Sequence, residues 1–263
     1  MEVIVARSTE SAVKLASTIM ADAIRSKPNL VLGLASGRTM EAVYVELARM
    51  HRQEYLDFSL VRTFNLDEYI GLGPDHRNSY RYYMNYNLFN NVNIDKRNTH
   101  LPNGLAEDTE LESAMYDQAI KEAGGIDIQL LGIGRDGHIG FNEPLSSLAS
   151  RTRAKCLTPE TIEQNSPLFE HPEDMPRRAF TMGVGTILEA RNILMLVTGS
   201  SKADVLAQAV EGPVTSMITA SALQLHPHVV VVADEKAAAK LQGRAYYDWV
   251  FQNEPKWVAY RNI

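Results

Sequence analysis

The chain has 263 residues, of which 45% are hydrophobic and 22% are charged, the composition of a globular protein long enough to bury a sizeable core. Its net charge of −6 argues against a nucleic-acid groove but is compatible with a local basic pocket for a small anion. The single cysteine, Cys156, excludes an internal disulfide and fits a reducing compartment, and no group of cysteines or histidines has the spacing of a metal site.

The N-terminal residues lack the features of a targeting segment. They have neither the basic start nor the long apolar core of a signal peptide, because Arg7 and Glu10 interrupt the first apolar run. No other run approaches the ~20 apolar residues of a membrane span. We therefore expect a cytoplasmic, soluble protein without a membrane or nucleic-acid partner.

Short apolar runs alternate with segments of helical periodicity. We expect strands at residues 3–6, 29–35, 60–66, 127–134, 192–199 and 228–234, and helices at 11–25 and 40–51. In the second helix, Ala42, Val45 and Leu47 fit a buried stripe. Since the strand runs are apolar at consecutive positions, their strands should be covered on both faces.

This order predicts the fold class. We expect one α/β domain over residues 1–263, with a Rossmann-like, mostly parallel sheet and helices on both faces. The active site should lie at the carboxyl ends of the strands. Residues 144–180 are the least regular section, with Pro159, Pro167, Pro172 and Pro176, and we expect them to form a lid rather than a second domain.

The loop ASGRT, residues 35–39, has the features of a phosphate-binding loop. Gly37 permits a close approach of the backbone, Ser36 and Thr39 offer hydroxyls, and the next helix offers free N–H groups. Arg38 pairs with a phosphate in this interpretation and points to solvent in the alternative. That alternative is an ordinary strand-to-helix turn with Thr39 as the N-cap.

The loop TGSSK, residues 198–202, repeats this logic after another strand. Lys202 at a helix start opposes the helix dipole, which favours an anionic partner over a merely solvated lysine. The chain contains no GxGxxG, no Walker GKS/T and no GxSxG motif. Dinucleotide binding, nucleotide triphosphate binding and serine hydrolase chemistry are therefore disfavoured.

Two further strand ends carry carboxylates. In NLDEY, residues 65–69, Asp67 and Glu68 are adjacent, so on an extended chain only one of them should reach a given pocket. Either is a candidate base, and an acidic turn is the alternative.

The loop RDGHIGFNE, residues 135–143, is the strongest local signal. It places His138, which can titrate near neutral pH, between Asp136 and Glu143, the pattern of a catalytic base with groups that orient it. The alternative is a polar turn with a hydrogen-bonded histidine.

These loops together resemble the glucosamine-6-phosphate deaminase family, also called glucosamine-6-phosphate isomerases. The resemblance lies in FNLDEYIGL (64–72), GIGRDGHIGFNEP (132–144), SSLASRTRAK (146–155) and GSSKA (199–203), with LGLASG (32–37). It extends to about Lys236. The tail YYDWVFQNEPKWVAY does not share it, and either a neighbouring subunit or the chain's own core could receive that tail.

The resemblance implies the conversion of glucosamine 6-phosphate and water to fructose 6-phosphate and ammonia, without a metal or an organic cofactor. It implies that Asp67 moves a proton between C2 and C1 of the open-chain sugar. It also implies that His138 opens the sugar ring and that Asp136 and Glu143 hold and tune His138.

The same resemblance assigns the 6-phosphate to Ser36, Gly37, Thr39 and Lys202. This chain departs from the family where the usual GGTP reads Gly37-Arg38-Thr39-Met40, and where Pro167 replaces a phosphate-binding arginine of the lid. Our hypothesis is that Arg38 takes over from that arginine. The alternative is a different substrate, such as a galactosamine phosphate.

A regulatory site is also implied. Ser146, Arg153 and Lys155 match the residues that bind the activator N-acetylglucosamine 6-phosphate in hexameric family members. Such a site lies between subunits, so we expect a homo-oligomer, either a hexamer or a smaller ring. A basic lid face without a ligand is the alternative.

These motifs are also compatible with two rival functions. The first is another sugar-phosphate enzyme on the same fold, such as a galactosamine-6-phosphate deaminase or a phosphogluconolactonase. The second is a non-catalytic sugar-phosphate sensor.

Overall fold

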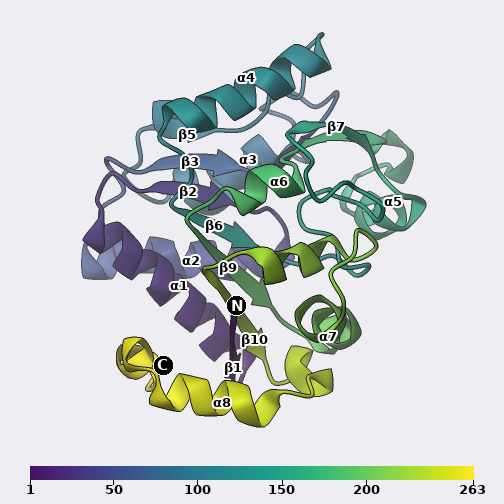
Figure 1. The fold of residues 1–263 in the computed structure, drawn as a ribbon. Helices are drawn as coiled ribbons and strands as arrows, with labels where there is room; N and C mark the ends of the chain where they lie inside the picture. The colour runs from purple at the N-terminus through teal and green to yellow at the C-terminus, as the bar shows by residue number, and fades with distance from the viewer.

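The computed structural model describes residues 1–263, and its main feature is a sheet in which all neighbouring strands are parallel (Figure 1). In spatial order the strands are β1 (Glu2–Ala6), β10 (Val229–Asp234), β9 (Asn192–Val197), β6 (Ile128–Leu131), β2 (Val31–Leu34), β3 (Arg62–Asn65) and β5 (Thr99–His100). Six of these confirm the predicted strands. The seventh, β5, has two residues, too few to produce a hydrophobic pattern.

Eight α-helices surround the sheets, which confirms the predicted α/β class. They are α1 (Thr9–Ser26), α2 (Arg38–Glu54), α3 (Tyr80–Met84), α4 (Thr109–Glu122), α5 (Pro159–Asn165), α6 (Val184–Leu188), α7 (Ala203–Glu211) and α8 (Arg244–Asn253). Helices α1 and α2 pack against each other, while α4 and α8 lie at opposite edges of the sheet (Figure 1). No helix combines the length and the apolar character needed to cross a lipid bilayer.

The buried face of α2 differs from the prediction. Met40, Val43, Tyr44 and Leu47 are buried, whereas Val45 is 60% exposed. Ala42 is exposed as well. The buried positions follow the i, i+3, i+4, i+7 spacing that starts at Met40, so helical geometry, not the apolar character of a single residue, decides the inward face.

A second, antiparallel sheet was not predicted. It consists of β4 (Asp67–Tyr69), β8 (Arg178–Thr181) and β7 (Arg153–Cys156), in that order. The expected lid therefore enters and leaves through two paired strands, and α5 lies between them in the sequence. A small cluster of buried side chains, which includes Tyr69, Phe141 and Phe169, packs beneath it.

The end of the C-terminal segment packs on the chain's own core, one of the two places expected for the tail. Trp257 is 5% exposed, and its Nε1 donates a hydrogen bond of 2.8 Å to Oε2 of Glu2 in β1. Tyr260 donates to Oδ2 of Asp22 in α1 over 3.0 Å.

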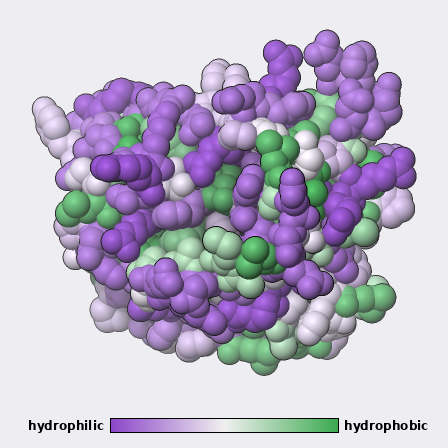
Figure 2. All heavy atoms as spheres, turned by 90° about the horizontal axis from the view of Figure 1, so that it is seen from above, coloured by the Kyte–Doolittle hydropathy of each residue, from purple (hydrophilic) through white to green (hydrophobic).

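Hydrophilic residues cover most of the face shown in Figure 2, with hydrophobic residues in smaller patches between them.

We predict that Trp257→Ala destabilises the fold by ~3–5 kcal/mol, the usual range for removing a buried tryptophan. Trp249 is the matched control, because its side chain is 61% exposed. Trp249→Ala should change the free energy of unfolding by less than ~0.5 kcal/mol. Urea denaturation of both variants measures this, and equal effects would contradict the role given to Trp257.

Candidate active site

A cavity of about 520 Å³ opens at the carboxyl edge of the main sheet. Loops that follow β2, β3, β6 and β9 line it, together with lid residues from 164 to 169. Its lining includes the predicted Ser36, Gly37, Arg38, Thr39, Asp67, His138 and Lys202. Residues from four separate loops therefore face one space.

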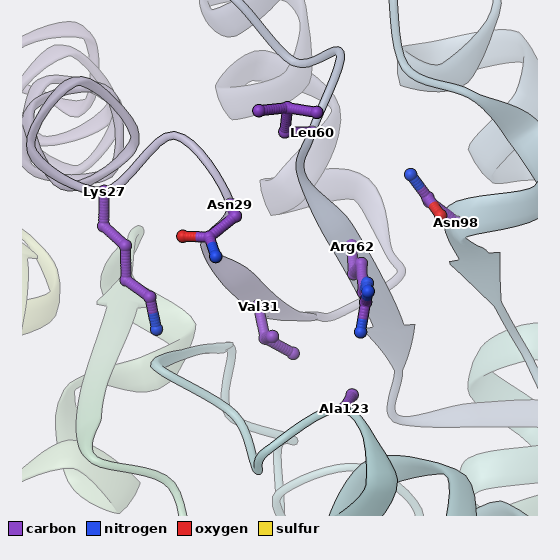
Figure 3. A pocket seen from close by; sticks show the side chains of 7 residues that line it. All are labelled: Lys27, Asn29, Val31, Leu60, Arg62, Asn98 and Ala123. Atoms are coloured by element: carbon purple, nitrogen blue, oxygen red, sulfur yellow. The ribbon is translucent and has the colours of Figure 1, made fainter.

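A smaller hollow of about 230 Å³ lies at the opposite edge of the sheet, and its lining residues are drawn in Figure 3. Val31 and Arg62 line it, and these residues begin β2 and β3. It therefore lies at the amino ends of the strands. None of the predicted site residues lines it.

His138 lies in a tight loop of residues 134–138. Gly134 N donates to the carbonyl oxygen of His138 over 2.8 Å, and Gly137 N donates to that of Gly134 over 3.3 Å. Gly137 has a φ of +88°, a conformation that favours glycine. A Cβ at Gly134 would lie 2.5 Å from Nε2 of His138, so the imidazole packs directly on the glycine backbone.

Two carboxylates hold the imidazole. Nδ1 of His138 lies 2.7 Å from Oδ1 of Asp136 and 3.3 Å from Oε2 of Glu143. The ring N–H is not aligned with either oxygen as a regular hydrogen bond, but both contacts stabilise the protonated ring. Because Nδ1 faces the carboxylates, Nε2 is the nitrogen available to a ligand in the cavity.

These contacts make His138 a cation at neutral pH. Burial lowers the pKa of the imidazole, but the contacts with Asp136 and Glu143 outweigh burial and raise it to about 9. The prediction of a histidine between carboxylates is confirmed, whereas the expected titration near neutral pH is wrong. The reason is that two negative charges, both close to Nδ1, stabilise the protonated ring.

Glu143 also connects the imidazole to the lid. It is 1% exposed, and its Oε1 accepts a hydrogen bond of 3.1 Å from the backbone N–H of Thr158, the N-cap of α5. Burial raises the pKa of Glu143, but His138 outweighs burial and lowers it. The carboxylate therefore stays ionised between the loop and the lid helix.

Asp67 is a buried carboxylate at the floor of the cavity. Burial, and then the charge of Glu68, raise its pKa to about 8, while the charge of His138 acts in the opposite direction. Gly140 comes so close that a Cβ there would lie 3.6 Å from Oδ2 of Asp67. Asp67 and the histidine loop therefore meet in one place.

Glu68 points away from this cavity, as the alternation along an extended chain predicts. Its carboxylate accepts backbone hydrogen bonds of 2.9 Å each from Tyr69, Tyr80 and Arg81. The last two residues begin α3, which carries Tyr80 and Tyr83 to the cavity wall. Glu68 therefore holds the start of α3 in place and does not face the cavity.

The ASGRT loop has unpaired groups that suit an anion. Gly37, with a φ of +124°, is the N-cap of α2, so the alternative in which Thr39 caps the helix is wrong. The Oγ of Ser36 is buried and has no hydrogen-bond partner. Tyr83 donates to the carbonyl oxygen of Gly37 over 2.8 Å and fixes the loop. Arg38 is exposed at the cavity.

Lys202 reaches the same cavity from the 3-10 turn before α7. Burial, and then the positive charge of Arg135, lower its pKa to about 8. Its loop is held by Asp234, a 1% exposed carboxylate that accepts two 3.1 Å hydrogen bonds from Gly199 N. Asp234 was not predicted, because at the end of a strand it looks like an ordinary acidic turn residue.

The expected regulatory residues lie outside the cavity. The Oγ of Ser146 is buried without a partner. Arg153 and Lys155 occupy alternate positions of β7 and share a face. Arg153 donates to Oδ1 of Asn142 over 2.9 Å, so its guanidinium already has one structural contact.

Several lining residues were missed by sequence reasoning. They are the cations Arg77 and Arg135 and the aromatic residues Tyr69, Tyr80, Tyr83, Phe141 and Phe169. Arg135 stands directly before Asp136 in the strongest motif, which is a signal that could have identified it. The aromatic residues gave no signal, because the second sheet that gathers them was not predicted.

The donor set at His138 also suits a divalent cation, because two carboxylates and an imidazole offer atoms within 4.8 Å of one another. A metal would have to displace the proton that the two carboxylates stabilise on the imidazole. Charge balance therefore favours the proton here. That the site works without a metal or cofactor stays a prediction.

Comparisons with known proteins agree on a family. Residues 6–233 match the family model for glucosamine-6-phosphate isomerases and 6-phosphogluconolactonases. A glucosamine-6-phosphate deaminase from Hahella chejuensis is 50% identical over 95% of both chains. Another from Shewanella woodyi is 46% identical over 98% of both, so this relative also matches most of the C-terminal tail.

The fold agrees as well. The solved structure of a monomeric glucosamine-6-phosphate deaminase has a TM-score of 0.89 and 43% identity to this chain. The match covers 91% of this chain and all of that one.

We predict that the imidazole of His138 titrates at about pH 9. Asp136→Asn should lower that pKa by about one unit or more, because it removes one of the two charges that stabilise the cation. An NMR titration of histidine-labelled protein measures this pKa, and the signal of His138 is assigned by its absence in His138→Gln. Asp75→Asn, at an exposed position, is the matched control. An unshifted His138 pKa in Asp136→Asn would contradict the electrostatic account.

The raised pKa also links stability to pH. Because the folded pKa lies above the ordinary value of 6.5, the contribution of His138 is complete below that pH and is lost as pH rises through about 9. The advantage of wild type over His138→Gln in unfolding free energy should decline across this window. A constant difference would contradict the linkage.

Proposed function

The chain belongs to the family of glucosamine-6-phosphate isomerases and 6-phosphogluconolactonases, and we propose that it converts glucosamine 6-phosphate and water to fructose 6-phosphate and ammonia. One observation carries the proposal: a buried carboxylate, Asp67, and a protonated imidazole, His138, face one cavity that also holds unpaired cations. Aldose–ketose proton transfer needs the first group, ring opening needs the second, and a sugar phosphate needs the cations.

Ring opening is the first step. Nε2 of His138 donates its proton to the ring oxygen as the bond from C1 to that oxygen breaks, and the O1 hydroxyl returns a proton to the imidazole. The result is the open-chain aldehyde with an unchanged catalyst. Asp136 and Glu143 keep the ring charged and oriented, and they touch Nδ1 rather than the sugar.

Isomerisation follows at Asp67. Its carboxylate removes the proton from C2, which leaves an enolamine, and returns it to C1, so that C2 becomes an iminium carbon. A buried Asp67 with a pKa of about 8 is mostly protonated without substrate. The substrate's ammonium group, bound beside it, lowers that pKa and makes the carboxylate available as a base.

Deamination completes the reaction. Water adds to the iminium carbon at C2, ammonia leaves, and the ketone of fructose 6-phosphate remains. Each proton that Asp67 and His138 remove or donate is returned, so the three reaction steps need no oxidant, reductant or organic cofactor.

The 6-phosphate positions the sugar from a distance. We assign it to the Ser36 hydroxyl, to Gly37 and Thr39 at the N-terminus of α2, and to Lys202. Pro167 does not line the cavity, whereas Arg38 does. This supports the hypothesis that Arg38 supplies the positive charge that the lid lacks.

The finer expectations stay proposals. A buried, unpartnered Ser146 hydroxyl, together with Arg153 and Lys155 on one face of β7, supports an activator site for N-acetylglucosamine 6-phosphate. A homo-oligomer rests on that site alone, and the similar solved structure is of a protein described as monomeric. A single cysteine supports a cytoplasmic location.

We predict that Asp67→Asn lowers the rate of ammonia release from glucosamine 6-phosphate by at least ~10²-fold, because it keeps the shape but removes the base. Binding of fructose 6-phosphate should persist, and Asp75→Asn on the exposed loop should match wild type. Galactosamine 6-phosphate is assayed beside the glucosamine compound.

The outcomes separate the rival functions. Ammonia release from galactosamine 6-phosphate alone would support the same mechanism but make that compound the substrate. No release from either, by a folded protein that still binds sugar phosphates, would favour a sensor or a lactonase.

We predict that Arg38→Ala raises KM for glucosamine 6-phosphate by about tenfold or more, because it removes a charge-assisted contact to the phosphate. Steady-state kinetics beside Arg52→Ala measures this, since Arg52 is an exposed arginine at the other end of α2. If KM is unchanged in both variants, Arg38 does not replace the missing lid arginine.

A further inference from the structure

Arg135 has no role in the function proposed above, although it lines the same cavity. The basic residues in that lining are Arg38, Arg77, Arg135 and Lys202. Arg77 lies 3.9 Å from Glu170, while no carboxylate forms an ion pair with any of the other three. The cavity therefore contains more unpaired positive charge than Arg38 and Lys202 provide.

The loop geometry explains why Arg135 is unpaired. Asp136, its neighbour, lies 2.7 Å from Nδ1 of His138 and also accepts a hydrogen bond of 3.2 Å from His138 N. Its carboxylate is thus engaged by the histidine. Arg135 belongs to the same short loop, closed by the hydrogen bonds of Gly134, but it is exposed at the cavity.

Arg135 and Lys202 come from different loops and line the same cavity. Burial, and then the charge of Arg135, lower the pKa of Lys202 to about 8, while the charge of Asp136 acts in the opposite direction. Two like charges at one wall of a cavity repel each other, and an anion between them relieves that repulsion. The buried, unpartnered Ser36 hydroxyl and the N-terminus of α2 line the same cavity and favour the same kind of ligand.

We propose that Arg135 is a second phosphate ligand beside Lys202 and that this pair selects phosphorylated sugars over free sugars. The proposal rests on the proposed function, because the 6-phosphate of its substrate is the anion. A guanidinium offers two parallel N–H donors to a phosphate, and Lys202 adds a single charged donor. With Arg38, which the proposed function also places at the phosphate, they bring three positive charges to the dianion.

Direct binding tests this without turnover. Calorimetry with fructose 6-phosphate and with inorganic phosphate should show that Arg135→Gln raises Kd for both by about tenfold or more. Fructose, which has no phosphate, should bind weakly and equally to wild type and variant. Arg135→Lys keeps the charge but loses the two parallel donors. Its Kd for each phosphate ligand should therefore lie between that of wild type and that of Arg135→Gln.

Arg7→Gln is the matched control. Arg7 is exposed, follows β1 at the same edge of the sheet and does not line the cavity. Its replacement should leave both Kd values unchanged. An effect as large as that of Arg135→Gln would mean that net charge, not a contact, sets the affinity.

The pH dependence separates a phosphate contact from a structural role. In wild type, affinity for fructose 6-phosphate should fall above about pH 8 as Lys202 loses its proton. In Arg135→Gln the fall should move to higher pH, because Lys202 no longer has a cation beside it. A loop that was merely distorted would not move this profile.

Two results would decide against parts of the account. An unchanged Kd in Arg135→Gln, with weaker binding in Lys202→Gln, would overturn the role of Arg135. Arg135-dependent binding of fructose 6-phosphate, by a protein that releases no ammonia from glucosamine 6-phosphate, would overturn the proposed function and leave this site in place.

Discussion

Because all strands of the main sheet run parallel, the loops after them meet at one edge, and the site depends on this constraint. Asp67, His138 and Lys202 are far apart in the sequence but follow β3, β6 and β9, respectively. A parallel strand needs a crossover to the next, and here these crossovers include the helices that cover the sheet. The parallel direction of the strands therefore brings a carboxylate, an imidazole and an ammonium group to one cavity.

The charged groups that shape this edge have partners, with one exception. Asp136 and Glu143 stabilise the His138 cation, and Asp234 holds the backbone of the Lys202 loop through neutral N–H groups. The exception is the set of unpaired cations, which lies in a protein with a net charge of −6. A positive cavity in a negative surface concentrates field lines at the mouth of the site and attracts anionic substrates from solution.

Much of this arrangement could be predicted from the sequence, and the failures have physical causes. Long apolar runs identified six strands, and the clustered polar residues after them identified Asp67, His138 and Lys202. The small antiparallel sheet was missed because its strands are short and paired across distant segments, and because β7 is partly exposed. The pKa of His138 could not be predicted either, because it depends on distances of 2.7 and 3.3 Å that a spacing in sequence does not fix.

The contact between Glu2 and Trp257 lies where the first strand of the chain meets its last segment. In β1, Glu2 pairs with Val230 of β10, so this strand has no partner in the sheet until β10 is in place. Until then β1 is an apolar strand without a hydrogen-bonded neighbour. Closing it requires contacts of very long sequence separation, which are slow to form. The edge at β1 is therefore completed only once β10 has formed, and α8 then packs beside it.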